Sequence, residues 1–126
     1  MKYTQIDWLS ANIDEARKIA SQLVQDKLVA CANIIPIVES IYVWEGKLES
    51  SAEVKVSLKT TSDHFEAVKS YIEAHSSYQV PCILETVING GNAVYLEWMS
   101  KSTRKPKLAK VESCCEAVDV CCEKGS

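Results

Sequence analysis

One stretch decides the fold of this chain: residues 34 to 47, which read IIPIVESIYVWEGK. It lies within a longer segment, residues 29 to 48, whose β-branched and aromatic residues are typical of an extended strand. Pro36 has no amide hydrogen to give to a strand ladder, so it marks an edge, a bulge or a kink. Glu45-Gly46-Lys47 then predicts a turn.

The residues after this turn predict a second strand. Three apolar residues alternate with polar ones from Glu53 to Lys59, and this period of two is typical of a strand with one solvated face; they are Val54, Val56 and Leu58. Together the two strands predict a long antiparallel hairpin.

The segments on either side of the hairpin complete the expected fold. Asn12 and Glu15 form a variant of the capping box at the start of a helix over residues 13 to 28. The remaining expected elements are a first strand over residues 2–9, a second helix from Ser62 to about Ser76, a core strand over 82–88, and a short third helix capped by Asn92. The order predicts a ferredoxin-like α+β domain, βαββαβ with an extra C-terminal helix.

Composition limits the possible functions. A chain of 126 residues fits one domain, and its small size favours burial of further surface in an oligomer. The net charge of −3 gives no general attraction for nucleic acid or an anionic membrane. We find no signal peptide and no run of about 20 apolar residues, so we expect a cytoplasmic protein without membrane spans.

Several local sequences resemble the CutA, or divalent-cation tolerance, family. They are ACANIIP at 30–36, SIYVWEGKLE at 40–49, the strand at 53–60, YQVP at 78–81, and the segment 91–98. The resemblance runs from about residue 3 to 102, in order. We therefore expect a CutA-like domain over residues 1–102 and a cysteine-rich tail over 103–126, either helical or disordered.

The resemblance implies a non-enzymatic homotrimer in which hairpin strands pair across subunits. It also implies divalent-cation or copper binding and a role in metal tolerance. The family's trimer looks like that of PII signalling proteins, so an alternative is a scaffold or small-ligand sensor that binds at the inter-subunit cleft. The chain has no glycine-rich phosphate loop, no HExxH run and no Gly-x-Ser-x-Gly elbow, so we expect neither an organic cofactor nor an enzyme.

The resemblance also implies a metal site at His75 and Cys82. They occupy the positions of the family's histidine and glutamate donors, while Trp8 stands where some members have a cysteine. An imidazole with a thiolate is a soft set suited to copper(I) or zinc. The alternatives to a metal site are that His75 interacts with the dipole at the C-terminus of its helix, and that Cys82 is a small buried residue in a strand.

Five residues are candidates for a ligand cleft or an interface: Tyr42, Trp44, Lys59, Tyr78 and Trp98. Large aromatic residues often pack interfaces, whereas Lys59 and Tyr78 offer polar groups to an anionic ligand. A solvated strand face is the alternative for Lys59. Cys31 is expected in the core and His64 on the surface.

The tail carries two pairs of adjacent cysteines: Cys114, Cys115, Cys121 and Cys122. Four thiolates suit a soft metal ion. Cys115 and Cys122 share a helical stripe with Val111 and Val118, so packing is an alternative, as are disorder, a disulfide and lipidation. We expect all six cysteines of the chain to be reduced.

Overall fold

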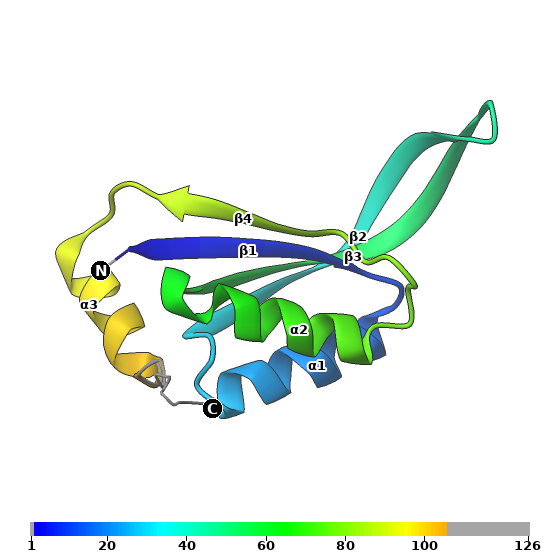
Figure 1. The fold of residues 1–126 in the computed structure, drawn as a ribbon. Helices are drawn as coiled ribbons and strands as arrows, with labels where there is room; N and C mark the ends of the chain where they lie inside the picture. The colour runs from blue at the N-terminus through cyan, green and yellow to red at the C-terminus, as the bar shows by residue number, and fades with distance from the viewer. Residues whose placement is uncertain (1, 106–126) are drawn as a thin grey trace, which may run out of the picture.

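The computed structural model describes residues 2–105. Its elements follow the order predicted from the sequence (Figure 1): β1 (Tyr3–Ser10), α1 (Ile13–Gln25), β2 (Cys31–Trp44), β3 (Lys47–Thr61), a 3₁₀ turn (Ser62–His64), α2 (Phe65–His75), β4 (Ile83–Ile88) and α3 (Ala93–Ser102).

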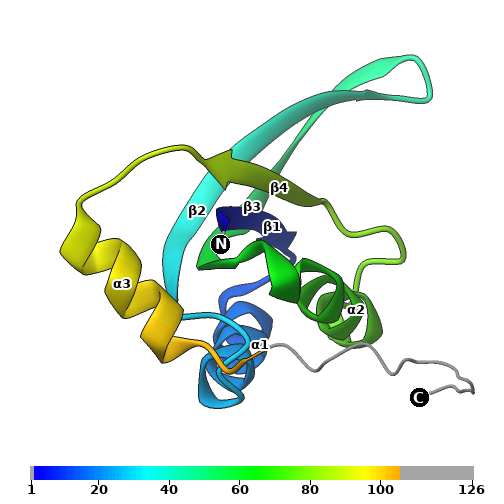
Figure 2. The ribbon, with the colours of Figure 1, turned by 60° about the vertical axis from the view of Figure 1, so that its left-hand side comes forward.

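The four strands form one antiparallel sheet in the order β2-β3-β1-β4. Helices α1 and α2 lie side by side on one face of it, and α3 lies at one end near the start of β2 (Figures 1 and 2). The fold is therefore mixed α/β, with an antiparallel sheet that helices cover on one face.

The β2–β3 hairpin extends well past the helices (Figure 1). Trp44 pairs with Lys47 across a turn in which Glu45 (φ 50°) and Gly46 (φ 79°) are both left-handed, as tight hairpin turns require. Pro36 was expected to mark an edge, a bulge or a kink; the ladder is irregular between Ile35 and Val38, and β2 also lies at the edge of the sheet.

The core lies between the sheet and the two helices. Every second residue of β1 is buried, which is the alternation expected of a strand with one packed face. The main residues of the core are Ile6, Trp8, Ala16, Ile19, Leu23, Val56, Leu58, Val68 and Ile72. Each large side chain that is fully buried stabilises the fold by roughly 1.5–3 kcal/mol.

Helix α1 ends at Gln25, three residues before the predicted end. The reason is Lys27, whose left-handed backbone (φ 59°) turns the chain out of the helix. The amide of Leu28 then donates to the carbonyl of Leu23 at 3.0 Å, which closes the last turn.

Three expectations about single residues are wrong. Cys82 precedes β4, an edge strand, and it is exposed rather than buried. Cys31 is only partly buried, because its Sγ lies at the surface 3.5 Å from the Tyr95 hydroxyl. His64 is 4% exposed, and its Nε2 donates to the Arg104 carbonyl at 2.7 Å.

None of the helices within residues 2–105 is long and apolar enough to cross a membrane.

Candidate functional site

A cavity of about 930 Å³ lies where the hairpin leaves the sheet. We call it the hairpin-base cavity. Its walls come from β1, β2, β3 and the loop of residues 78–82, so segments distant in sequence meet there. The side chains that carry polar or aromatic chemistry are Tyr42, Trp44, Glu49, Glu53, Tyr78 and Cys82.

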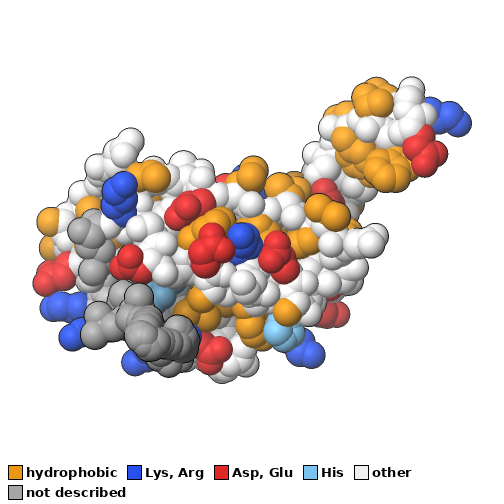
Figure 3. Space-filling view, viewed as in Figure 1, with side chains coloured by type: hydrophobic (Ala, Val, Ile, Leu, Met, Phe, Trp, Pro, Cys, Tyr) orange, Lys and Arg blue, Asp and Glu red, His pale blue; other side chains and the backbone are white. Residues whose placement is uncertain are grey.

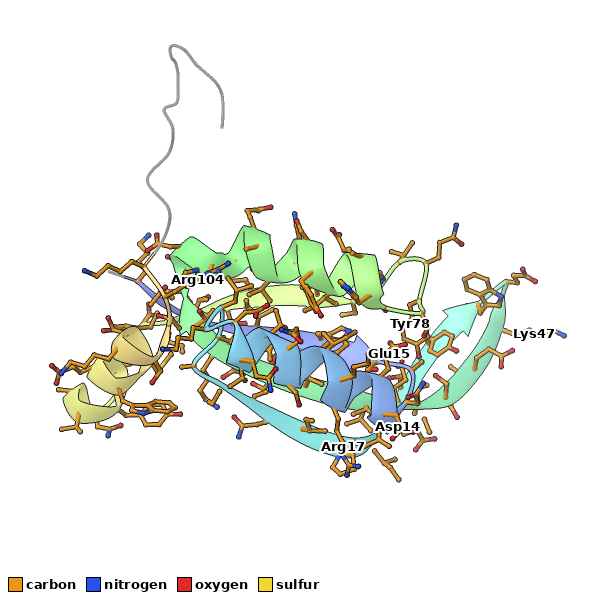
Figure 4. The ribbon with its side chains drawn as sticks, turned by 90° about the horizontal axis from the view of Figure 1, so that it is seen from below. Asp14, Glu15, Arg17, Lys47, Tyr78 and Arg104 are labelled. Atoms are coloured by element: carbon orange, nitrogen blue, oxygen red, sulfur yellow. The ribbon has the colours of Figure 1, made fainter. Side chains whose placement is uncertain are left out.

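The loop at this cavity is held from both sides. The Tyr78 hydroxyl donates to Oε2 of Glu53 at 2.8 Å, and the amide of Ser77 donates to Oε1 of Glu15 at 3.1 Å. Figure 4 shows Glu15 and Tyr78 at the same end of the molecule, with Lys47 farther out on the hairpin and Arg104 at the opposite end. The loop is thus tied to both α1 and β3.

Burial, followed by the hydrogen bond and the negative charge of Glu53, raises the pKa of Tyr78 to about 12. The hydroxyl therefore stays protonated and keeps donating at neutral pH.

The charge of the hairpin-base cavity is negative. Glu49 and Glu53 both line it, and its described lining contains no lysine, arginine or histidine. Neither carboxylate belongs to an ion pair within residues 2–105. A cationic ligand fits this lining better than an anionic one.

His75 lines a separate cavity of about 260 Å³ between α1 and α2, together with Glu15 and Tyr71. Its Nδ1 donates to the Tyr71 carbonyl at 2.8 Å, and the two rings stack with centroids 4.0 Å apart. This bond leaves Nε2 with its lone pair, and a backbone carbonyl commonly orients a metal-binding histidine in this way.

The structure does not bring His75 and Cys82 to one cavity, because Cys82 lines the hairpin-base cavity instead. Within residues 2–105, no three His, Cys, Asp or Glu side chains are grouped as a metal site. Trp8 is fully buried in the core. The cysteines of the tail, Cys114, Cys115, Cys121 and Cys122, lie outside the described residues.

Of the five cleft candidates, Tyr42, Trp44 and Tyr78 meet in the hairpin-base cavity, whereas Lys59 and Trp98 are not among its lining residues. The Lys59 ammonium donates to Oδ1 of Asn33. Trp98 packs against Tyr95 on α3, with ring centroids 5.3 Å apart.

Sequence reasoning missed Glu49 and Glu53 as cavity residues. The signal was available in their spacing, because residues 49, 51 and 53 fall on one face of a strand.

The fold and the cavity define a mixed α/β protein with a projecting hairpin and a negatively charged pocket at its base. Residues 8–102 match the family model of the CutA1 divalent ion tolerance protein. The chain therefore belongs to the CutA1 divalent ion tolerance family.

Relatives agree with this assignment. A chloroplastic CutA protein of Arabidopsis thaliana is 41% identical over 93 residues, which are 74% of this chain and 51% of the relative, so the chain spans about half its length. The divalent-cation tolerance protein CutA of Escherichia coli K12 is 40% identical over 89 residues, which are 71% of this chain and 80% of the Escherichia coli protein. The crystal structure of CutA1 from Oryza sativa has a TM-score of 0.80 at 34% identity and covers 83% of this chain and 96% of that one.

Proposed function

We propose that this protein binds a divalent or soft metal ion, with copper as the first candidate, and acts without catalysis in metal tolerance in the cytoplasm. Family membership supports metal tolerance. The single observation that supports binding is the state of His75, whose Nδ1 is occupied by the Tyr71 carbonyl while Nε2 is left as an acceptor.

His75 and Cys82 are the proposed donors in the body of the domain. Both are exposed, so a metal ion reaches them from solvent. Imidazole and thiolate form a soft set, which favours copper(I) or zinc over a hard cation. The two residues line separate cavities, so one chain does not bring both to a single ion, and tight binding requires further donors from a neighbouring copy or from the tail thiols.

A homotrimer of ferredoxin-like domains is part of this proposal. The hairpin exposes large apolar side chains that one chain leaves uncovered, including Ile37 at 75% and Leu48 at 76% exposure. Figure 3 shows apolar side chains gathered over the hairpin end. Among residues 2–105, strands β2 and β4 form the edges of the sheet, and unpaired edges favour pairing with another chain. A monomeric mass by light scattering at micromolar concentration would exclude the trimer.

Copper titration of the reduced full chain tests the metal proposal. The variants are His75→Ala, Cys82→Ser and a chain in which the four tail cysteines are serine. A loss of stoichiometry or affinity in the first two supports the donors in the body. Unchanged binding in both, with loss in the tail variant, moves the site to the tail. No binding by any chain rejects metal binding.

A second proposal is a small-ligand sensor of the PII kind, with the hairpin-base cavity as one wall of an inter-subunit cleft. The volume of about 930 Å³ and the mixture of aromatic and charged walls favour it, because such pockets hold metabolite-sized ligands. A metabolite screen by thermal shift tests this proposal. A screen without any stabilising compound counts against it.

A further inference from the structure

Helix α3 exposes a large apolar face. Met99 is its buried residue, whereas Val94 is 79% and Trp98 44% exposed. Tyr95 lies beside Trp98, with ring centroids 5.3 Å apart, and its hydroxyl lies 3.5 Å from the Cys31 thiol. Residues three and four positions apart are neighbours on a helix, so Val94, Tyr95 and Trp98 form one continuous surface, which we call the α3 face.

This helix needs more packing than residues 2–105 give it. It has ten residues, and isolated helices shorter than about 12–15 residues are marginal in water. It stands at one end of the domain (Figure 2), and Met99 is the one buried side chain that it contributes within the described part of the chain. Exposed aromatic and apolar side chains that gather on one surface mark a contact with another segment. We therefore expect the α3 face to be covered.

The chain leaves α3 from a fixed point. The Arg104 amide donates to the Lys27 carbonyl at 2.8 Å, and the Arg104 carbonyl accepts a 2.7 Å hydrogen bond from His64. Residues 106 to 126 therefore start beside the C-terminal end of α3. The four residues after Arg104 reach about 13 Å, so the chain can turn back along α3, which is about 15 Å long.

The sequence after residue 105 carries an apolar stripe. Its residues follow one another at intervals of three and four positions, which is the pattern of a helix that packs against one other helix; they are Leu108, Val111, Cys115, Val118 and Cys122. The carboxylates of this segment all lie off the stripe; they are Glu112, Glu116, Asp119 and Glu123. A helix from residue 108 to 122 rises about 21 Å, which is enough to span the α3 face.

We propose that residues 108–122 fold back on α3 as an amphipathic helix, with the stripe against Val94, Tyr95 and Trp98. Two antiparallel helices with a short connection, here residues 103–107, form an αα-hairpin. Docking buries Cys115 and Cys122, and it leaves Cys114 and Cys121 beside the stripe and open to solvent. The α3 face is distinct from the cavities of His75 and of the hairpin base, so the inference goes beyond the proposed functions.

Pulsed alkylation with iodoacetamide tests the proposal on the reduced full chain, with a chelator present to remove bound metal. Tandem mass spectrometry distinguishes the two cysteines of each pair, and rates in concentrated urea correct for their different neighbours. Cys115 and Cys122 are expected to react about fivefold more slowly than Cys114 and Cys121, because alkylation requires the tail to leave α3. Equal corrected rates within each pair overturn the proposal, including the case in which a second copy covers α3 instead.

Variants on both sides of the contact locate it. Trp98→Ala is expected to bring the rates of the two cysteines in each pair within about twofold of each other. Val118→Asp should do the same from the tail without changing the body of the domain. Val120→Asp is the matched control, because residue 120 falls on the opposite side of a helix from the stripe, and it should keep the protection. Protection that persists in Trp98→Ala, or that is lost equally in both valine variants, overturns the proposal.

Discussion

The Tyr78 hydroxyl and the Glu53 carboxylate join the loop after α2 to the base of the hairpin through a 2.8 Å hydrogen bond. The two residues are 25 positions apart in the chain. Because Ser77 is tied to Glu15 as well, the loop bridges α1 and β3 and forms one wall of the hairpin-base cavity. The shape of the cavity therefore depends on a side-chain contact as well as on the sheet.

We expect the stability of the protein to fall between about pH 10 and pH 12 through Tyr78. Its pKa rises from 10.0 to about 12 in the folded protein, first through burial and then through Glu53. The unfolded chain loses the phenol proton first, so the contribution is complete below pH 10 and is lost as pH rises through 12. Denaturant unfolding across this range measures it. Tyr78→Phe should remove this part of the dependence of the unfolding free energy on pH. An unchanged pH dependence in the variant would contradict the assignment.

Thr60→Val is expected to destabilise the protein by about 1–3 kcal/mol. The buried Thr60 hydroxyl donates to the Leu28 carbonyl at 2.7 Å, and valine keeps the shape but removes the donor. Chemical denaturation gives the free energy of unfolding. Thr86→Val on the exposed edge strand is the matched control, with an expected change within about 0.5 kcal/mol. Equal effects of the two substitutions would rule out a special role for the buried hydroxyl.

The order of the elements was predictable because hydrophobic period depends on local geometry. The alternation of Val54, Val56 and Leu58 requires only a strand with one buried face, and the structure buries all three. The missing amide hydrogen of Pro36 likewise predicted an edge, a bulge or a kink, and the ladder is irregular at this position.

Burial of single polar residues was less predictable, because it depends on partners far away in the sequence. His64 lies 40 positions from Arg104, whose carbonyl accepts the hydrogen bond of the buried imidazole. The predicted burial of Cys82 failed because the sequence does not reveal which strand lies at the sheet edge. Likewise, the family positions of His75 and Cys82 do not show that they line different cavities.

We expect His64→Ala to loosen the segment that follows α3. The His64 Nε2 bond to the Arg104 carbonyl and the Arg104 amide bond to the Lys27 carbonyl, at 2.7 and 2.8 Å, hold the same residue from two sides. Loss of one bond, worth about 1 kcal/mol, should speed hydrogen exchange at the Arg104 amide about fivefold. The Leu96 amide, which bonds to Asn92 within α3, is the internal control. Equal acceleration at both amides would indicate global destabilisation instead.

We expect the substitution of asparagine by alanine to have different effects at the two helix N-caps. Asn12 Oδ1 accepts a 2.8 Å hydrogen bond from the Glu15 amide at the start of α1, so Asn12→Ala should cost about 1 kcal/mol of unfolding free energy. Asn92 occupies the same position before α3 but forms no side-chain cap bond, which corrects the expectation from sequence. Asn92→Ala should therefore change stability by less than about 0.5 kcal/mol. Thermal and denaturant unfolding of both variants decide the matter, since equal losses would show that residue type rather than the observed hydrogen bond determines the cap.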